Sequence, residues 1–246
     1  MGQKQNTIFG IHPIQEAITS KVIIDKLFIQ KDSTNPKIED ILKMLSESDT
    51  TITQVPVEKL NRLTRGNHQG IVAITSPISF SSLEDVVEKA LAKAEDPLFL
   101  VLDQISDVRN FGAIIRTAEC TGVDAIIIQK KGGAPVTGDT VKTSAGAIFK
   151  IPICKVDHIK DAIFYLQASN IETISATEKT EQSIYNLDLK KPIAIILGSE
   201  DKGDSKSVLN IVDHKAALPL KGQVNSLNVS VACGAFLYEV VRQRSL

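Results

Sequence analysis

The sequence predicts an α/β protein in two parts, a small α/β unit followed by a larger unit with a parallel sheet. Short apolar runs alternate with helix-like stretches along the chain. After residue 97 these runs become continuously apolar, which is typical of strands buried on both faces of a parallel sheet. A segment flanked by Pro77 and Pro97 separates the two regions. With 43% hydrophobic and 23% charged residues among 246, the composition is that of a globular protein.

The first region, residues 1–76, is expected to form a compact α/β domain. Apolar residues recur there at helical spacing in some stretches and form short β-rich runs in others. The expected helices cover residues 13–20 and 36–46, and the expected strands cover residues 22–30, 51–55 and 70–75.

A linker helix is expected within residues 77–97. Residues 82–95 have the apolar spacing of an amphipathic helix, and Ser82 stands where an N-cap belongs. Glu84 and Asp85 fall in the first turn, where the helix dipole favours acidic side chains.

Residues 98–246 are expected to form a parallel sheet with helices on both faces, because strand-like and helix-like stretches alternate throughout. The expected strands cover residues 97–102, 125–129, 171–175, 192–197 and 215–220. The expected helices cover residues 111–121, 140–149, 158–169 and 205–211, and a long final helix covers 226–243.

Three loops that follow expected strands carry polar residues, and ligands of such sheets bind at the carboxyl ends of strands. The first loop leads into a helix that holds Asn110 and Arg116. The second brackets Glu200 with Gly198 and Gly203, and the third ends where a helix is expected to start near Ser226. Taken singly, each loop also has an ordinary explanation as a helix cap or a tight turn.

Several classes of protein are excluded by what the sequence lacks. No apolar run reaches the ~18–20 residues of a membrane span, and the first residues lack a signal-peptide core, so we expect a cytoplasmic protein that does not enter a membrane. The three cysteines and four histidines show no metal-ligand spacing, so no metal is expected. Dinucleotide, P-loop and nucleophile-elbow motifs are absent. The net charge of -1 means that any RNA must bind local patches.

In this order, the three loops resemble the three motifs of the SpoU/TrmH family of RNA ribose 2'-O-methyltransferases. The matching positions are Asp107, Asn110, Gly112, Arg116, Thr117 and Ala118 in the first motif, Gly198, Glu200 and Gly203 in the second, and Pro219, Ser226, Leu227, Asn228, Val229, Ser230 and Ala232 in the third. Val108 replaces the proline of the first motif, which leaves the polar positions intact.

The resemblance implies a SPOUT methyltransferase domain whose C-terminal chain forms a trefoil knot, preceded by a small ribosomal-protein-like domain that binds RNA. It implies S-adenosylmethionine as the cofactor, held near Gly198, Leu218 and Leu227. The candidate catalytic residues that it implies are Asn110, Arg116, Glu200, Ser226 and Asn228.

The resemblance also implies a homodimer that methylates a ribose of ribosomal RNA, with a guanosine of 23S RNA as the target. A guanidinium stays protonated, so Arg116 is expected to act by its charge rather than as a base. Whether Glu200 accepts the proton or anchors the arginine stays open. Two alternatives also remain: an enzyme of the same chemistry that acts on transfer RNA, and a non-catalytic RNA-binding or ribosome-assembly protein on this scaffold.

Overall fold

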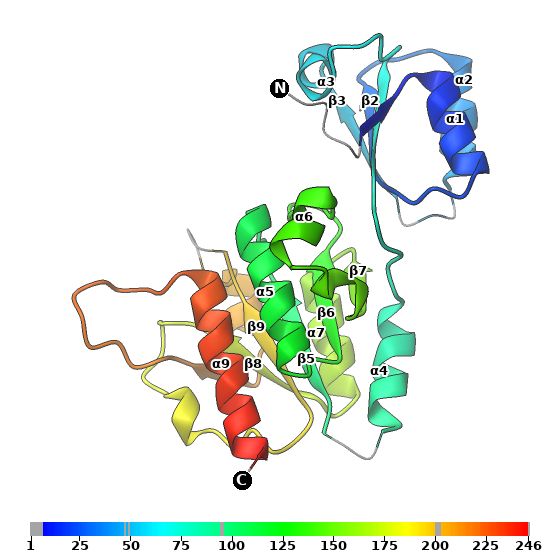
Figure 1. Cartoon of the computed structure of the whole chain (residues 1–246). Helices are drawn as coiled ribbons and strands as arrows, with labels where there is room; N and C mark the ends of the chain where they lie inside the picture. The colour runs from blue at the N-terminus through cyan, green and yellow to red at the C-terminus, as the bar shows by residue number, and fades with distance from the viewer. Residues whose placement is uncertain (1–6, 47, 49, 94–95, 200–202, 246) are drawn as a thin grey trace. The chain divides into compact units, whose positions relative to one another are not determined.

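The computed structural model describes residues 7–46, 48, 50–93, 96–199 and 203–245, and the chain divides into two compact units (Figure 1). The first unit takes the described residues up to Ser79 together with Pro135–Asp139. The second takes the rest, from Phe80 onwards.

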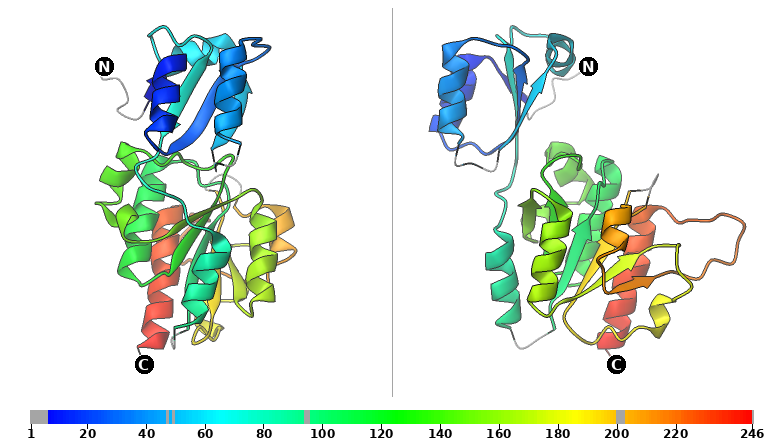
Figure 2. Two further views of the ribbon diagram at one scale, coloured as in Figure 1. Left: turned by 90° about the vertical axis from the view of Figure 1, so that its right-hand side faces the viewer. Right: turned by 180° about the vertical axis from the view of Figure 1, so that it is seen from behind.

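The first unit is a four-stranded sheet, in the order β1-β4-β2-β3, with helices on both faces. Its elements are β1 (Thr7–Phe9), α1 (Ile11–Thr19), β2 (Ile24–Gln30), α2 (Pro36–Met44), β3 (Thr51–Val55), α3 (Val57–Leu63) and β4 (Ile71–Thr75). Strands β2 and β3 run parallel, and the other pairs are antiparallel. Helices α1 and α2 lie on one face of the sheet and α3 lies on the other (Figure 2). Helices α1 and α2 share one apolar cluster with the sheet, and Leu60 of α3 belongs to another.

The helices and strands expected in this unit are confirmed to within about two residues, but β1 and α3 were not expected. Strand β1 has three residues, all half-buried, and α3 buries only Leu60. Elements this short, with so little buried apolar surface, leave no clear period in a sequence.

The second unit contains a parallel six-stranded sheet in the order β10-β8-β9-β5-β6-β7. From Phe80 onwards the strands are β5 (Leu98–Leu102), β6 (Ala125–Gln129), β7 (Ile153–Val156), β8 (Glu172–Ala176), β9 (Ile193–Leu197) and β10 (His214–Ala216). The helices are α4 (Leu83–Leu91), α5 (Val108–Cys120), α6 (Gly138–Thr143), α7 (Ile159–Ala168), α8 (Lys206–Leu209) and α9 (Val229–Arg244), with short 3-10 turns η1 (Ala147–Phe149) and η2 (Ile184–Asn186). The expected fold class is therefore confirmed.

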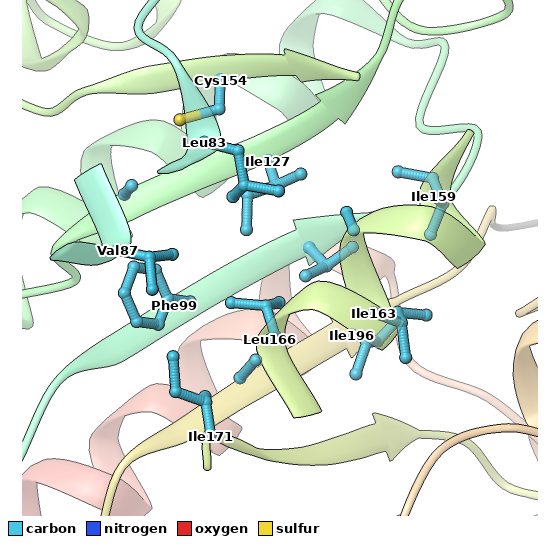
Figure 3. Packing of buried hydrophobic residues seen from close by; sticks show 14 of the residues in the cluster. Leu83, Val87, Phe99, Ile127, Cys154, Ile159, Ile163, Leu166, Ile171 and Ile196 are labelled. Atoms are coloured by element: carbon cyan, nitrogen blue, oxygen red, sulfur yellow. The ribbon is translucent and has the colours of Figure 1, made fainter. Parts of the chain in front are cut away.

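Helices cover both faces of this sheet. On one face, α4 and α7 pack against alternate strand residues such as Phe99 and Ile127 (Figure 3). On the other face, α5 and α9 lie side by side (Figure 1). The helix expected as a linker is thus α4, which begins after Ser82 and packs into the core of the second unit.

The expectation of one helix over residues 140–149 is wrong, because the segment forms α6 and the separate turn η1. Ala145 and Gly146 both adopt positive φ, 51° and 81°, which a right-handed helix cannot contain. Strand β7 was not expected, and Lys155 within it interrupts the apolar run.

The final helix begins later than expected, at Val229 rather than near Ser226. Asn228 is its N-cap, and the Asn228 side-chain oxygen accepts hydrogen bonds from the backbone N–H groups of Ser230 (3.0 Å) and Val231 (3.4 Å). Ser226 and Leu227 consequently belong to the preceding loop. The strand expected over 215–220 is also shorter, with only three residues. Across the part of the chain that the structure describes, no helix has the length and apolar character needed to cross a membrane.

Candidate active site

A pocket of about 370 Å³ opens at the carboxyl ends of β8, β9 and β10. Its wall comes from the residues after β8, the loop after β9, the loop after β10, and the first two turns of α9. Strands β8 and β9 are neighbours in the sheet, and β10 pairs with β8, so the parallel topology itself brings these loops together.

Four of the eight predicted site residues lie in the wall of this pocket: Gly198, Leu218, Ser226 and Leu227. Glu200 lies outside the described residues. Asn110, Arg116 and Asn228 are not part of the wall within the described chain.

At Gly198 the start of the loop after β9 crosses closely over later residues of the same loop, Gly203 and Asp204. A Cβ atom at this position would collide with the backbone of Gly203 and Asp204. The crossing is held by a hydrogen bond from Gly203 N–H to the Ser199 carbonyl oxygen (2.7 Å). Only glycine fits there, and the pocket wall at Gly198 is bare backbone that a ligand can approach closely.

The pocket wall has an apolar part and a polar part. Leu197 at the end of β9, the leucines that follow β10, and Phe236 of α9 provide apolar surface. Thr177, Glu178 and Lys179, which directly follow β8, provide polar groups, and the sequence analysis did not select them. The available signal was their place immediately after an apolar strand, the same signal that identified the other loops.

Helices α5 and α9 start beside each other, and a hydrogen bond joins the N-cap of α9 to the first turn of α5. Asp107 caps α5 by accepting from the backbone N–H groups of Arg109 (2.8 Å) and Asn110 (2.9 Å). The Asn228 amide then donates to the Asn110 side-chain oxygen (3.1 Å). Asn228 therefore acts with both ends of its amide, because its oxygen caps α9 while its nitrogen orients Asn110.

Arg116 lies two turns into α5 on its exposed side. The guanidinium makes no hydrogen bond or ion pair with any residue that the structure describes. An unneutralised cation at this place is able to attract a phosphate or a developing negative charge. Arg116 is not, however, within the wall of the pocket.

Two carboxyl groups are buried behind the pocket wall. Asp103, which follows β5, and Asp204, in the loop after β9, are each 3% exposed. The Ser205 backbone N–H donates to Asp103 (3.1 Å), and the Ser175 hydroxyl donates to Asp204. Burial is the main cause that raises the pKa of Asp204 to about 7. Among the described residues, no cluster of three or more acidic, histidine or cysteine side chains is arranged to hold a metal ion.

A parallel sheet covered by helices on both faces, with a pocket at its carboxyl edge, defines an α/β domain that binds a small ligand. The model of the SpoU rRNA methylase family matches residues 97–238, and that of the RNA 2'-O ribose methyltransferase substrate-binding domain matches residues 7–81. The chain therefore belongs to the SpoU rRNA methylase family.

A relative supports this assignment, and solved structures share the fold. A Bacillus subtilis (strain 168) protein named "Putative TrmH family tRNA/rRNA methyltransferase YacO" is 31% identical over 100% of this chain and 98% of its own length. The SpoU methyltransferase AviRb from Streptomyces viridochromogenes superposes with a TM-score of 0.63 at 22% identity, over 98% of this chain and 90% of its own. An AdoMet-bound rRNA methyltransferase from Sinorhizobium meliloti superposes with a TM-score of 0.62 at 25% identity, over 96% of this chain and 87% of its own.

Proposed function

We propose that this protein transfers a methyl group from S-adenosylmethionine to a ribose 2'-hydroxyl of ribosomal RNA, with a guanosine of 23S RNA as the target. The proposal rests mainly on one observation: the walls of the same pocket contain Gly198, Leu218, Ser226 and Leu227. Family membership supports the RNA methyltransferase chemistry. The cytoplasm, where ribosomal RNA is accessible, is the proposed location.

The residues of the pocket fit S-adenosylmethionine. The volume of about 370 Å³ lies within the usual range for small-molecule sites. Leu218 and Leu227 offer apolar surface suited to adenine, and the bare backbone at Gly198 lets a ligand come close enough to hydrogen-bond with main-chain groups. When bound, this cofactor supplies a methyl group on a positively charged sulfonium.

The predicted catalytic residues are proposed to act on the RNA. Arg116 would hold a neighbouring phosphate and favour negative charge on the ribose oxygen. Asn110, oriented by Asn228, would position the ribose. Ser226, exposed on the pocket wall, would contact the RNA backbone. Glu200 is proposed either to accept the proton or to anchor Arg116.

We also propose that two copies of the chain form a homodimer through the outer faces of α5 and α9. Val231 and Tyr238 of α9 are each 56% exposed, although both are apolar or aromatic, and they are seven residues apart on one helix face. Arg116 is exposed on the adjacent α5. Its position outside the pocket wall of its own chain supports a site completed by the second copy.

The test of the proposed function is to map 2'-O-methylated riboses in RNA from cells with and without the gene. We expect one site in 23S ribosomal RNA to lose its methyl group when the gene is deleted and to regain it when the wild-type gene is returned. Loss of a transfer RNA methyl group instead would support the alternative substrate. If every ribose methyl group remained, the non-catalytic alternative would replace the proposal.

A further inference from the structure

Two buried carboxyl groups anchor one loop of the pocket. The two described ends of the loop after β9, residues 198–199 and 203–205, contribute Gly198, Ser199 and Gly203 to the pocket wall. The second of these ends is held by Asp103, which accepts from the Ser205 backbone N–H (3.1 Å). The position of residues 203–205 relative to the sheet therefore depends in part on the hydrogen bonds of these carboxyl groups.

Asp204 joins this loop to the neighbouring strand β8. One oxygen of its carboxyl group, Oδ2, accepts a hydrogen bond from the hydroxyl of Ser175 in β8. The other oxygen, Oδ1, is buried without a hydrogen-bond partner among the described residues. Because Gly198 crosses directly over the backbone of Gly203 and Asp204, a movement of Asp204 would also move the pocket wall.

The charged groups around Asp204 come from the ends of two strands. Asp103 lies at the end of β5, and Glu178 and Lys179 follow β8. Burial raises the pKa of Asp204 most, Asp103 and Glu178 raise it further, and the Ser175 hydroxyl and Lys179 lower it, so that it reaches about 7. A buried carboxylate with one hydrogen bond, close to another carboxyl group, is unfavourable unless water reaches it.

We propose that Asp204 is a positioning residue of the pocket, whose uncharged carboxyl group holds Gly203 and Asp204 against Gly198 in the arrangement that binds the methyl donor. Ionisation of Asp204 favours an arrangement in which Asp204 has moved away from Gly198 and Ser175 and water hydrates the carboxylate. The inference rests on the proposed function, since it places the donor in this pocket. Its consequence is that the affinity for the donor falls as the pH rises through neutrality.

The sign follows from proton linkage. The arrangement with Asp204 buried binds the Asp204 proton more tightly than a hydrated arrangement would, because the pKa of the buried carboxyl is raised. The buried arrangement is therefore most favoured at low pH and is lost as the pH rises through about 7. If Asp204 could not leave its buried position, the protein would bind the donor equally at every pH in this range.

The experiment is a calorimetric titration of the full chain with S-adenosylhomocysteine, the demethylated form of the proposed cofactor, between pH 6 and 8.5. We expect the dissociation constant of the wild type to rise about tenfold across this range. In D204N, which cannot ionise, we expect a nearly flat profile. In S175A, which removes a group that lowers the Asp204 pKa, we expect the rise to move to higher pH. D161N, an exposed Asp on α7, is the matched control and should keep the wild-type profile.

Melting temperatures recorded at each pH separate positioning from a purely structural role. If Asp204 only affected stability, D204N would change the melting temperature and leave the pH profile of binding unchanged, which would overturn the inference. A wild-type profile that is flat would overturn it as well, as would a D204N profile equal to the wild type. Should D204N fail to fold, the shifted S175A profile decides alone. Absence of binding at every pH in the wild type would instead refute the proposed function.

Discussion

Single residues at the carboxyl ends of strands determine what the pocket of this protein can do. Gly198 exemplifies what a sequence can predict, because a glycine directly after an apolar strand marks a close backbone approach, and the structure places it in a crossing that admits no side chain. Asp204 exemplifies what a sequence cannot predict. Its neighbours in the chain are polar, and its burial becomes visible only when β5 and β8 are placed on either side of β9.

Arg116 is the residue whose replacement tests the proposed chemistry. We expect R116A to slow methyl transfer to RNA by about 10²–10³-fold, because a cation that stabilises developing charge is lost. R116K should recover only part of the rate, since lysine keeps the charge but not the planar fork of donors. Affinity for S-adenosylhomocysteine should stay within about twofold in both, because Arg116 is outside the pocket wall.

The control for this pair is K160A, which removes an exposed cation from α7 on the opposite face of the sheet. Rates measured with saturating RNA and radiolabelled donor distinguish the variants. Full activity in both R116A and R116K would remove Arg116 from the proposed mechanism.

At the scale of elements, the regular strands and helices were predictable, whereas helix starts and short pieces were not. Strands β5, β6 and β9 are almost entirely apolar runs, and burial on both faces explains why the sequence shows them clearly. The start of α9 was misplaced, because Ser226 and Asn228 are both good N-caps by residue type and only the backbone conformation selects Asn228.

Asn228 allows the cap of α9 to be separated from the orientation of Asn110. N228A should lower stability by about 1 kcal/mol, because the cap is lost. N228D should keep that stability, since a carboxylate accepts the same backbone N–H groups. N228D should nevertheless reduce methyl transfer as strongly as N228A. A carboxylate cannot donate a hydrogen bond to the Asn110 oxygen, so the side-chain amide of Asn110 must rotate to exchange its oxygen and nitrogen.

Urea unfolding and RNA methylation rates measured on the same preparations check this pair. If N228D were as active as the wild type, the hydrogen bond between Asn228 and Asn110 would have no part in the reaction. If N228D were as unstable as N228A, the capping interpretation would fail.

At the scale of the whole molecule, the sequence correctly indicated an α/β chain in which a smaller α/β region is followed, along the chain, by a region with a parallel sheet. The trefoil knot implied by the family resemblance stays a prediction, and so do the boundaries at residues 76 and 97. Periodicity reports which residues are buried, but it carries no information about how the chain passes through its own loops or pairs with a second copy.

The proposed dimer has a consequence for mixtures of inactive variants. R116A keeps an intact pocket, whereas L227E places a charge in the pocket wall and keeps Arg116. If Arg116 serves the pocket of the partner, half of the chains in an equal mixture form mixed dimers with one complete site each, so about a quarter of the wild-type activity should return. Each variant alone should stay nearly inactive.

Light scattering must first show that the variants are dimers and exchange subunits. Activity that fails to return despite exchange would show that Arg116 acts on the pocket of its own chain. A monomeric wild type would refute the proposed dimer itself.

The central claim is that the loops after β8, β9 and β10 form the site for S-adenosylmethionine, and calorimetric titration of the folded full chain tests it most directly. The wild type should bind one S-adenosylmethionine per chain, and both G198A and L227E should bind at least about tenfold more weakly, since the first displaces the loop crossing and the second charges the wall. G234A, at a helical glycine of α9 whose added Cβ would only reach ordinary contact with Thr117 (3.8 Å), should bind as the wild type does. Undetectable binding by the wild type, or wild-type affinity in both pocket variants, would contradict the account.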